Sequence, residues 1–242
     1  PATTDMKRKT LFFFIATICP ILLFSAPSSF AENHKTKPVV AVDIGHTKTK
    51  PGAVSATGIG EYFFNETIGR KLTQRLKEQG DYEPFLVNAG GNLGLRKRTD
   101  IANRKKAELF ISIHHDSVQP VYLSQWSYNG RPYSYCDRYE GFSIFYSGKN
   151  ARQQASLAFG EILGEKMLTA GFNPTLHHSE PVKGESRELV DRYRGIYRVD
   201  NWYVLHHAKM PAVILECGII VNRQEEKKLK DPAYQDKIVT AL

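Results

Sequence analysis

The chain lacks several features that mark specialised classes of protein. Its 242 residues include only three cysteines, too few for a disulfide scaffold. The sequence has no block of like charges and no run of lysine and arginine that resembles a nucleic-acid-binding arm. It also shows no internal repeat and no linker. With 24% charged and 41% hydrophobic residues, the composition is that of a globular protein and excludes a disordered or fibrous one.

The N-terminal segment has the pattern of a secretory signal peptide. A cationic stretch, Lys7–Lys9, precedes an apolar run, Leu11–Phe24, and small residues follow at Ser29 and Ala31. This order predicts upstream residues and a signal peptide over 1–31, with cleavage after Ala31. The apolar run is shorter than the ~20 residues of a membrane span, which favours a cleaved signal peptide. An uncleaved membrane anchor is the alternative. We therefore expect an exported protein, periplasmic or extracellular, without stable membrane insertion after cleavage.

Short apolar segments alternate with helical patterns along the rest of the chain. In Glu61–Gln79 an apolar residue recurs at every fourth position from Phe64 to Leu76, and Gly80 follows as a stop signal. The patterns predict strands at 37–44, 84–88, 109–113, 142–146 and 212–215, and helices at 61–79, 95–107, 150–170, 223–229 and from 231 onward. This alternation predicts an α/β fold, a single domain over 36–242 with a central, mostly parallel twisted sheet flanked by helices on both faces.

Gln119–Gly141 differs from its surroundings. It is rich in tyrosine, with proline and glycine, and it holds Trp126 and Cys136. We interpret this segment, residues 119–141, as a lid-like insertion. Its aromatic side chains are suited either to stacking on a sugar or peptide or to ordinary packing. Residues 172–195 are irregular, 201–208 are ambiguous, and a disulfide between Cys136 and Cys217 cannot be assigned from the sequence.

Candidate metal ligands follow three of the predicted strands. His46 comes after the first strand, His114 after the third, and Glu216 ends the last clear strand, while Glu61 opens the first helix. Ligands of α/β sheets collect beyond the carboxyl ends of strands, so these side chains are expected to converge. Two imidazoles and one carboxylate with an open fourth position are typical of catalytic zinc, and a second carboxylate suits a general base.

The spacing alone leaves alternatives open. Three adjacent histidine pairs compete as ligands, His114–His115, His177–His178 and His206–His207. Glu61 also fits the N-terminus of a helix, where the dipole favours a carboxylate. Glu216 follows four apolar residues, and a buried unpaired carboxylate is costly, which favours a functional or ion-paired role for it.

Ordered motifs along almost the whole chain after residue 38 sharpen this interpretation. They are Asp43–His46 (DIGH), Pro51–Ala53, Gly60–Glu61, Ser112–His114 (SIH) and Ile214–Gly218 (ILECG) with Asn222. Arg98 with Ile101–Asn103 fits the same pattern. Together these blocks resemble the zinc-dependent N-acetylmuramoyl-L-alanine amidases of the amidase-3 type.

The resemblance implies a function and a set of roles. One zinc ion is expected on His46, Glu61 and His114, with Glu216 as the catalytic carboxylate. The substrate is then peptidoglycan, cleaved at the amide between the lactyl group of N-acetylmuramic acid and L-alanine of the stem peptide. Some members of this family are held inactive by an extra helix and released by a partner, so an activator protein is a candidate partner.

The sequence departs from the family pattern at several positions, which leaves alternative functions open. Lys48 and Lys50 replace the usual residues after the first histidine and are suited to substrate carboxylates or to a solvated loop. His115 and Asp116 follow His114, and strand alternation points His115 away from it. Cys217 is expected to be a buried, inert thiol. The alternatives are another exported zinc hydrolase, such as a peptidase or deacetylase, and an inactive wall-binding module, which would not need all four site residues.

Overall fold

The structure, a computed structural model, describes residues 1–3, 36–183 and 186–242. The predicted signal peptide and its cleavage site after Ala31 lie outside the described residues. Thr36–Leu242 form one compact unit. Within the described part of the chain, no helix has both the length and the apolar character needed to cross a bilayer.

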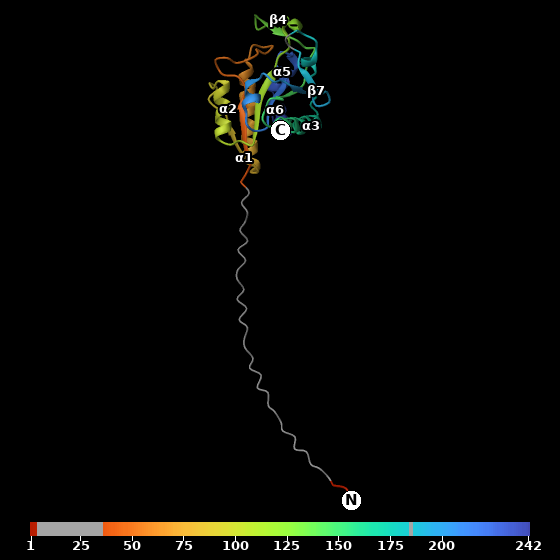
Figure 1. Ribbon diagram of the computed structural model, residues 1–242. Helices are drawn as coiled ribbons and strands as arrows, with labels where there is room; N and C mark the ends of the chain where they lie inside the picture. Colours follow the sequence, from red (N-terminus) through yellow and green to blue (C-terminus); the bar gives the residue numbers. More distant parts are fainter. Residues whose placement is uncertain (4–35, 184–185) are drawn as a thin grey trace. The chain divides into compact units, whose positions relative to one another are not determined.

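A seven-stranded mixed sheet lies at the centre of this unit (Figure 1). Across the sheet its strands are β2 (Glu83–Leu86), β1 (Val39–Ile44), β3 (Leu109–Asp116), β9 (Ala212–Ile219), β6 (Ser143–Tyr146), β8 (Ile196–Arg198) and β7 (Glu188–Asp191). The first four strands in this order are parallel, β6 is antiparallel to β9 and parallel to β8, and β7 is antiparallel to β8. The expectation of a mostly parallel sheet is confirmed, and β7 and β8 fall in or beside segments where no strand was predicted.

Helices cover both faces of the sheet, as predicted. One face packs against α1 (Glu61–Gln79), α3 (Gln153–Thr169), α5 (Arg223–Lys230) and α6 (Pro232–Ala241). The other packs against α2 (Leu95–Arg104) and the short α4 (Tyr203–His207). Figure 1 shows α2 and α3 on opposite sides of the sheet. The apolar residues at every fourth position of α1 all belong to or pack against the first of these two cores.

On one face of the sheet, the side chains of β3 and β9 change from apolar to polar along the strands. On β3, Ile111 and Ile113 enter the core under α1, while Phe110 enters the core under α2 and α4. Because side chains alternate along a strand, Ser112 and His114 continue the face of Phe110. The same face of β9 carries Ala212 and Ile214 before Glu216. This face is therefore apolar where the strands begin and polar where they end.

The segment over 119–141 forms a small hairpin of its own. A 3-10 turn, η1 (Pro120–Tyr122), leads into β4 (Ser124–Tyr128) and β5 (Arg131–Tyr135), which pair antiparallel. Asn129 and Gly130 both have positive φ, as a two-residue type I′ turn requires. Trp126 donates its Nε1–H to the Ala56 carbonyl at 2.7 Å, and the Arg223 guanidinium lies 5.0 Å from the centre of its ring. The hairpin thus packs on the loop that precedes α1.

Arg98 of α2 ties the end of β1 to its surroundings. The side chain is 2% exposed and lies 3.3 Å from the buried Asp43 carboxylate. It also donates to the carbonyls of Ile44 at 3.1 Å and Leu93 at 2.9 Å, and to that of His46. Ser112 donates to the same Asp43 oxygen at 2.7 Å. A buried charge needs such partners because its desolvation is costly.

We expect Arg98→Ala to lower the free energy of unfolding by about 3–5 kcal/mol, because Asp43 would be left as a buried charge without its partner. Urea unfolding monitored by circular dichroism measures this loss. Arg96→Ala is the matched control on the same helix. Arg96 is exposed and lies 3.8 Å from Asp100, so its removal should change stability little. Equal losses in the two variants would contradict the role given to Arg98.

Candidate metal centre and active site

His46 occupies an unusual backbone position directly after β1. Its φ is 62°, in the left-handed region that side chains with a Cβ rarely adopt. Asn88 fixes the conformation by donating to the His46 carbonyl at 2.8 Å and to the Ile44 carbonyl at 3.0 Å, and Arg98 donates to the His46 carbonyl as well. These bonds turn the imidazole toward Glu61, with Nε2 2.9 Å from Oε2.

Glu61 is the first residue of α1 and is held on both oxygens. Oε2 accepts from the Ala53 amide at 3.1 Å, and Oε1 accepts from the Asn65 side chain at 3.0 Å and the His115 amide at 3.3 Å. Burial favours the protonated acid, but hydrogen bonds from His114 and His46 outweigh it and lower the pKa of Glu61. The group is therefore an anion, as a metal ligand must be.

His114 completes this group from β3. Its Nδ1 lies 2.9 Å from Glu61 Oε1, opposite the oxygen that faces His46. Two glycines leave the room that this packing requires. A Cβ on Gly45 would lie 2.4 Å from His114 Nε2, and a Cβ on Gly52, where φ is +81°, would lie 2.3 Å from Glu61 Oε2.

The three predicted ligands thus come together, and their donor atoms lie within 4.8 Å of one another. Two imidazoles and one carboxylate that line a cavity suit a metal ion with an open coordination position. The residues present fit such an ion.

Glu216 lies beside this group on the neighbouring strand. β3 and β9 pair His114 with Glu216, so the two side chains share one face of the sheet. Glu216 is 7% exposed, and its Oε2 is buried without a hydrogen-bond partner. Burial, with the nearby charges of Asp116 and Glu61, raises the pKa of Glu216 well above its usual range. A buried carboxyl with a free oxygen and a raised pKa is suited to proton transfer.

His115 and Cys217 face the opposite side of the sheet, as strand alternation predicts. His115 Nδ1 lies 2.8 Å from Asn65 Oδ1, and burial lowers the pKa of His115 to about 3. Asn65 therefore links His115 to Glu61 one helical turn before it, a contact that sequence reasoning missed although the i, i+4 spacing carries it. Cys217 and Cys136 are both buried free thiols, and burial raises the pKa of Cys217.

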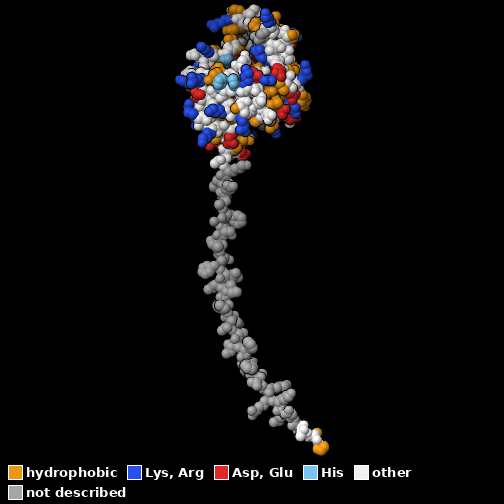
Figure 2. All heavy atoms as spheres, in the orientation of Figure 1, with side chains coloured by type: hydrophobic (Ala, Val, Ile, Leu, Met, Phe, Trp, Pro, Cys, Tyr) orange, Lys and Arg blue, Asp and Glu red, His pale blue; other side chains and the backbone are white. Residues whose placement is uncertain are grey.

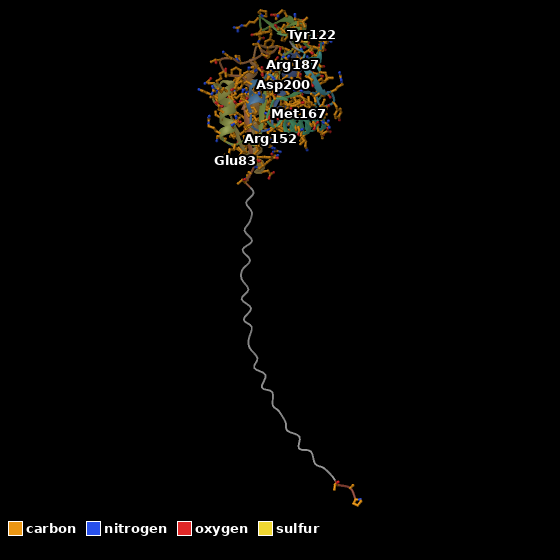
Figure 3. The ribbon with its side chains drawn as sticks, viewed as in Figure 1. Glu83, Tyr122, Arg152, Met167, Arg187 and Asp200 are labelled. Atoms are coloured by element: carbon orange, nitrogen blue, oxygen red, sulfur yellow. The ribbon has the colours of Figure 1, made fainter. Side chains whose placement is uncertain are left out.

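A cavity of about 510 Å³ opens over the candidate site. The four predicted residues line this cavity. Most of its other lining residues were not predicted from the sequence, among them Leu95, Arg187, Asn201, Trp202, Tyr203 and Val204. None of the lining residues comes from 119–141. In Figure 3, Arg187 lies toward the end of the domain that carries Tyr122 and away from Glu83, which starts β2. On the face drawn in Figure 2, histidine side chains reach the surface beside lysine and arginine side chains.

A second group with the same kinds of donor lies at the same cavity. Asp116, two residues after His114 on β3, meets His177 and His178 of the 3-10 turn η2 (His177–Ser179). Asp116 Oδ2 is 2.5 Å from His178 Nε2 and 3.5 Å from His177 Nε2. Burial lowers the pKa of His177 to about 4, so this imidazole is neutral at neutral pH.

Comparisons with known proteins agree with the fold and with the family that the motifs resemble. A sequence model of the N-acetylmuramoyl-L-alanine amidase family, amidase type 3, matches residues 40–242. The germination-specific N-acetylmuramoyl-L-alanine amidase of Bacillus subtilis is 24% identical over 259 residues, covering 98% of this chain and 92% of the relative.

Two solved structures share the fold. The catalytic domain of CwlV, an N-acetylmuramoyl-L-alanine amidase from Bacillus (Paenibacillus) polymyxa var. colistinus, superposes with a TM-score of 0.63 at 26% identity, covering 84% of this chain and 93% of that one. The CwlD amidase of Clostridioides difficile, solved in complex with the GerS lipoprotein, gives a TM-score of 0.61 at 21% identity, covering 85% and 94%.

The fold and the site define a single α/β domain with a candidate metal centre at the carboxyl ends of its parallel strands. The chain belongs to the N-acetylmuramoyl-L-alanine amidase family of the amidase-3 type, as the sequence motifs indicated.

We expect Asn65→Ala to weaken metal binding about 10- to 100-fold, as loss of a hydrogen bond to a ligand typically does. Asn65 holds Glu61 without facing the metal position itself. Competition with a chromogenic chelator measures the affinity, and circular dichroism checks the fold. Thr67→Ala is the control on the same helix, since the half-buried Thr67 donates its hydroxyl to the Phe63 carbonyl of its own helix and is not part of the candidate site. Unchanged affinity in Asn65→Ala would show that Glu61 is held without this bond.

Proposed function

We propose that this protein is a zinc amidase of peptidoglycan that hydrolyses the amide between the lactyl group of N-acetylmuramic acid and L-alanine of the stem peptide. The observation that carries the proposal is the convergence of His46, Glu61 and His114 beside the buried Glu216 in one cavity. Family membership supplies the substrate class. An imidazole and carboxylate donor set favours zinc over magnesium or calcium.

Each of the four residues has a separate task. A zinc ion held by His46, Glu61 and His114 would polarise the scissile carbonyl and lower the pKa of water. Glu216 accepts the proton of the attacking water and passes it to the departing alanine nitrogen. Its unpartnered Oε2 is the atom available for this transfer. The Asn88, Arg98 and Asn65 hydrogen bonds hold His46 and Glu61 in place while substrate binds.

The proposal extends to location and partners. Relatives named N-acetylmuramoyl-L-alanine amidases and the N-terminal pattern of residues 1–31 support export, to the periplasm or the extracellular space. The CwlD amidase was solved with a lipoprotein partner, which supports an activator protein as a candidate partner here. Lys48 and Lys50 are exposed in the loop after His46 and are proposed to meet substrate carboxylates.

We expect Glu216→Gln to lower kcat about 10²- to 10⁴-fold, the usual contribution of a general acid–base, while bound zinc stays at the wild-type level. Release of soluble peptides from purified peptidoglycan measures the activity, and atomic absorption measures the metal. Glu188→Gln, on the exposed edge strand β7, is the matched control and should keep full activity.

The products separate the proposed reaction from its alternatives. An amidase releases peptides with a free L-alanine amine and leaves a lactyl carboxyl on the glycan, whereas a deacetylase releases acetate and a peptidase cuts within the stem. Mass spectrometry of wild-type digests identifies the bond. Zinc bound without release of any product would favour the inactive wall-binding module.

The hairpin over 119–141 is proposed to contact substrate beyond the cavity, through the exposed face of β4 and β5. We expect replacement of residues 124–135 by a short glycine-containing turn to raise KM for peptidoglycan severalfold and leave the zinc content unchanged. A kinetic comparison on long glycan strands and on a short muropeptide is the test, because only the long substrate reaches past the cavity. A sharp rise in activity would instead identify the segment as inhibitory.

A further inference from the structure

The domain carries a second set of two histidines and one acidic residue that its proposed catalytic centre does not use. Asp116, His177 and His178 place their donor atoms within 4.8 Å of one another. We propose that these three residues bind a second divalent transition-metal ion, such as zinc, at the wall of the cavity that holds the first centre. The site does not rest on the proposed amidase activity, because its evidence is the geometry of the three side chains.

The two imidazoles converge on one oxygen atom. Neighbours in the chain, His177 and His178 lie with their ring centres 3.9 Å apart, and both present Nε2 to Oδ2 of Asp116. The other oxygen, Oδ1, already accepts from the Ser117 amide at 2.8 Å. Ordinary packing has no need to aim two imidazoles at the same oxygen, whereas ligands of one ion must converge in this way.

His177 has an unsatisfied nitrogen at the point where the ion would bind. Its side chain is fully buried, and Nε2 is buried without a hydrogen-bond partner. A buried donor or acceptor left in this state is costly, and coordination of an ion would satisfy it. The distance of 3.5 Å to Asp116 Oδ2 suits two ligands of one zinc ion, since bonds of about 2.0–2.2 Å place tetrahedral ligand atoms roughly 3.3–3.5 Å apart. The 2.5 Å between Asp116 Oδ2 and His178 Nε2 is a hydrogen-bond distance, and these two atoms would separate when an ion binds between them.

Surrounding residues orient the ligands as they do in metal sites. Thr175 Oγ1 lies 3.0 Å from His177 Nδ1 and fixes the ring so that Nε2 faces Asp116. Gln119, also buried, donates to the His177 carbonyl at 3.2 Å. Phe145 and Tyr197 pack edge-on against the His178 ring. A second hydrogen bond on the free ring nitrogen of a ligand histidine is a regular feature of zinc sites.

The position of this site relates it to the first centre. His114 of the first centre and Asp116 of the second group are two residues apart on β3, and Glu216 pairs with His114 on the neighbouring strand β9. Asp116 and His178 line the cavity together with His46, Glu61 and His114. A cation bound by Asp116 would thus lie at the same cavity as the first centre and Glu216.

Metal stoichiometry of the full chain tests the proposal. The protein is stripped with a chelator, loaded with Zn²⁺, freed of excess metal and analysed by atomic absorption. We expect two zinc ions per wild-type chain, one in His178→Ala, one in Glu61→Gln and none in the double variant. His206→Ala is the matched control, since His206 is exposed and outside both groups, and it should keep two.

One zinc ion in the wild type that Glu61→Gln removes and His178→Ala leaves in place would overturn the proposal. A fold check by circular dichroism accompanies each variant, and Asp116→Asn, which keeps the shape of the side chain, should also reduce the count to one. Cobalt substitution gives an independent readout, because the visible absorption of the second ion should disappear in His178→Ala and persist in Glu61→Gln. Peptidoglycan release is not part of this test, so an inactive enzyme with two ions would refute the proposed function alone.

Discussion

The guanidinium of Arg98 holds together the part of the domain on which the candidate centre depends. It lies in the interior between α2 and the end of β1, where it pairs with Asp43 and donates to backbone carbonyls at the point where the chain leaves the strand. One of these belongs to His46, whose left-handed backbone would otherwise be strained. The position of His46 therefore depends on the buried charge of Arg98 on α2, and not only on the loop that follows β1.

A parallel sheet accounts for most of the convergence at the site. The ends of β1, β3 and β9 meet at one edge, and pairing in register brings His114 next to Glu216 although the two residues are distant in sequence. Glu61 reaches this edge because α1 starts there and then runs back along the sheet. The sheet face that carries His114 and Glu216 is apolar where β3 and β9 begin, and there it packs under α2 and α4. One face of the sheet therefore contributes to the hydrophobic core and to the candidate site.

Sequence patterns predicted the elements whose signals are local. Helix α1 begins at Glu61 and ends at Gln79 as expected, because its apolar periodicity is regular and Gly80 stops it with a left-handed conformation. The strands β7 and β8 were missed since they are short and partly polar, and the pairing of β8 with β6 and of β7 with β8 is a tertiary effect. His46, Glu61, His114 and Glu216 were brought together as predicted, whereas the approach of His177 and His178 to Asp116 depends on an irregular segment whose path no local pattern indicates. Metal binding by His46, Glu61 and His114 and proton transfer by Glu216 stay predictions.

The pairing of β3 with β9 has a consequence for how the domain acquires its shape. Phe110 pairs with Ala212, so the central contact of the sheet closes a loop that contains nearly half the chain. Closing such a loop costs entropy before its contacts repay it, which predicts slow folding with the first parallel strands formed early and β9 inserted late. Glu216 would then reach His114 only in the last stage, so a partly folded chain could bind metal at the first centre before it has any hydrolytic activity.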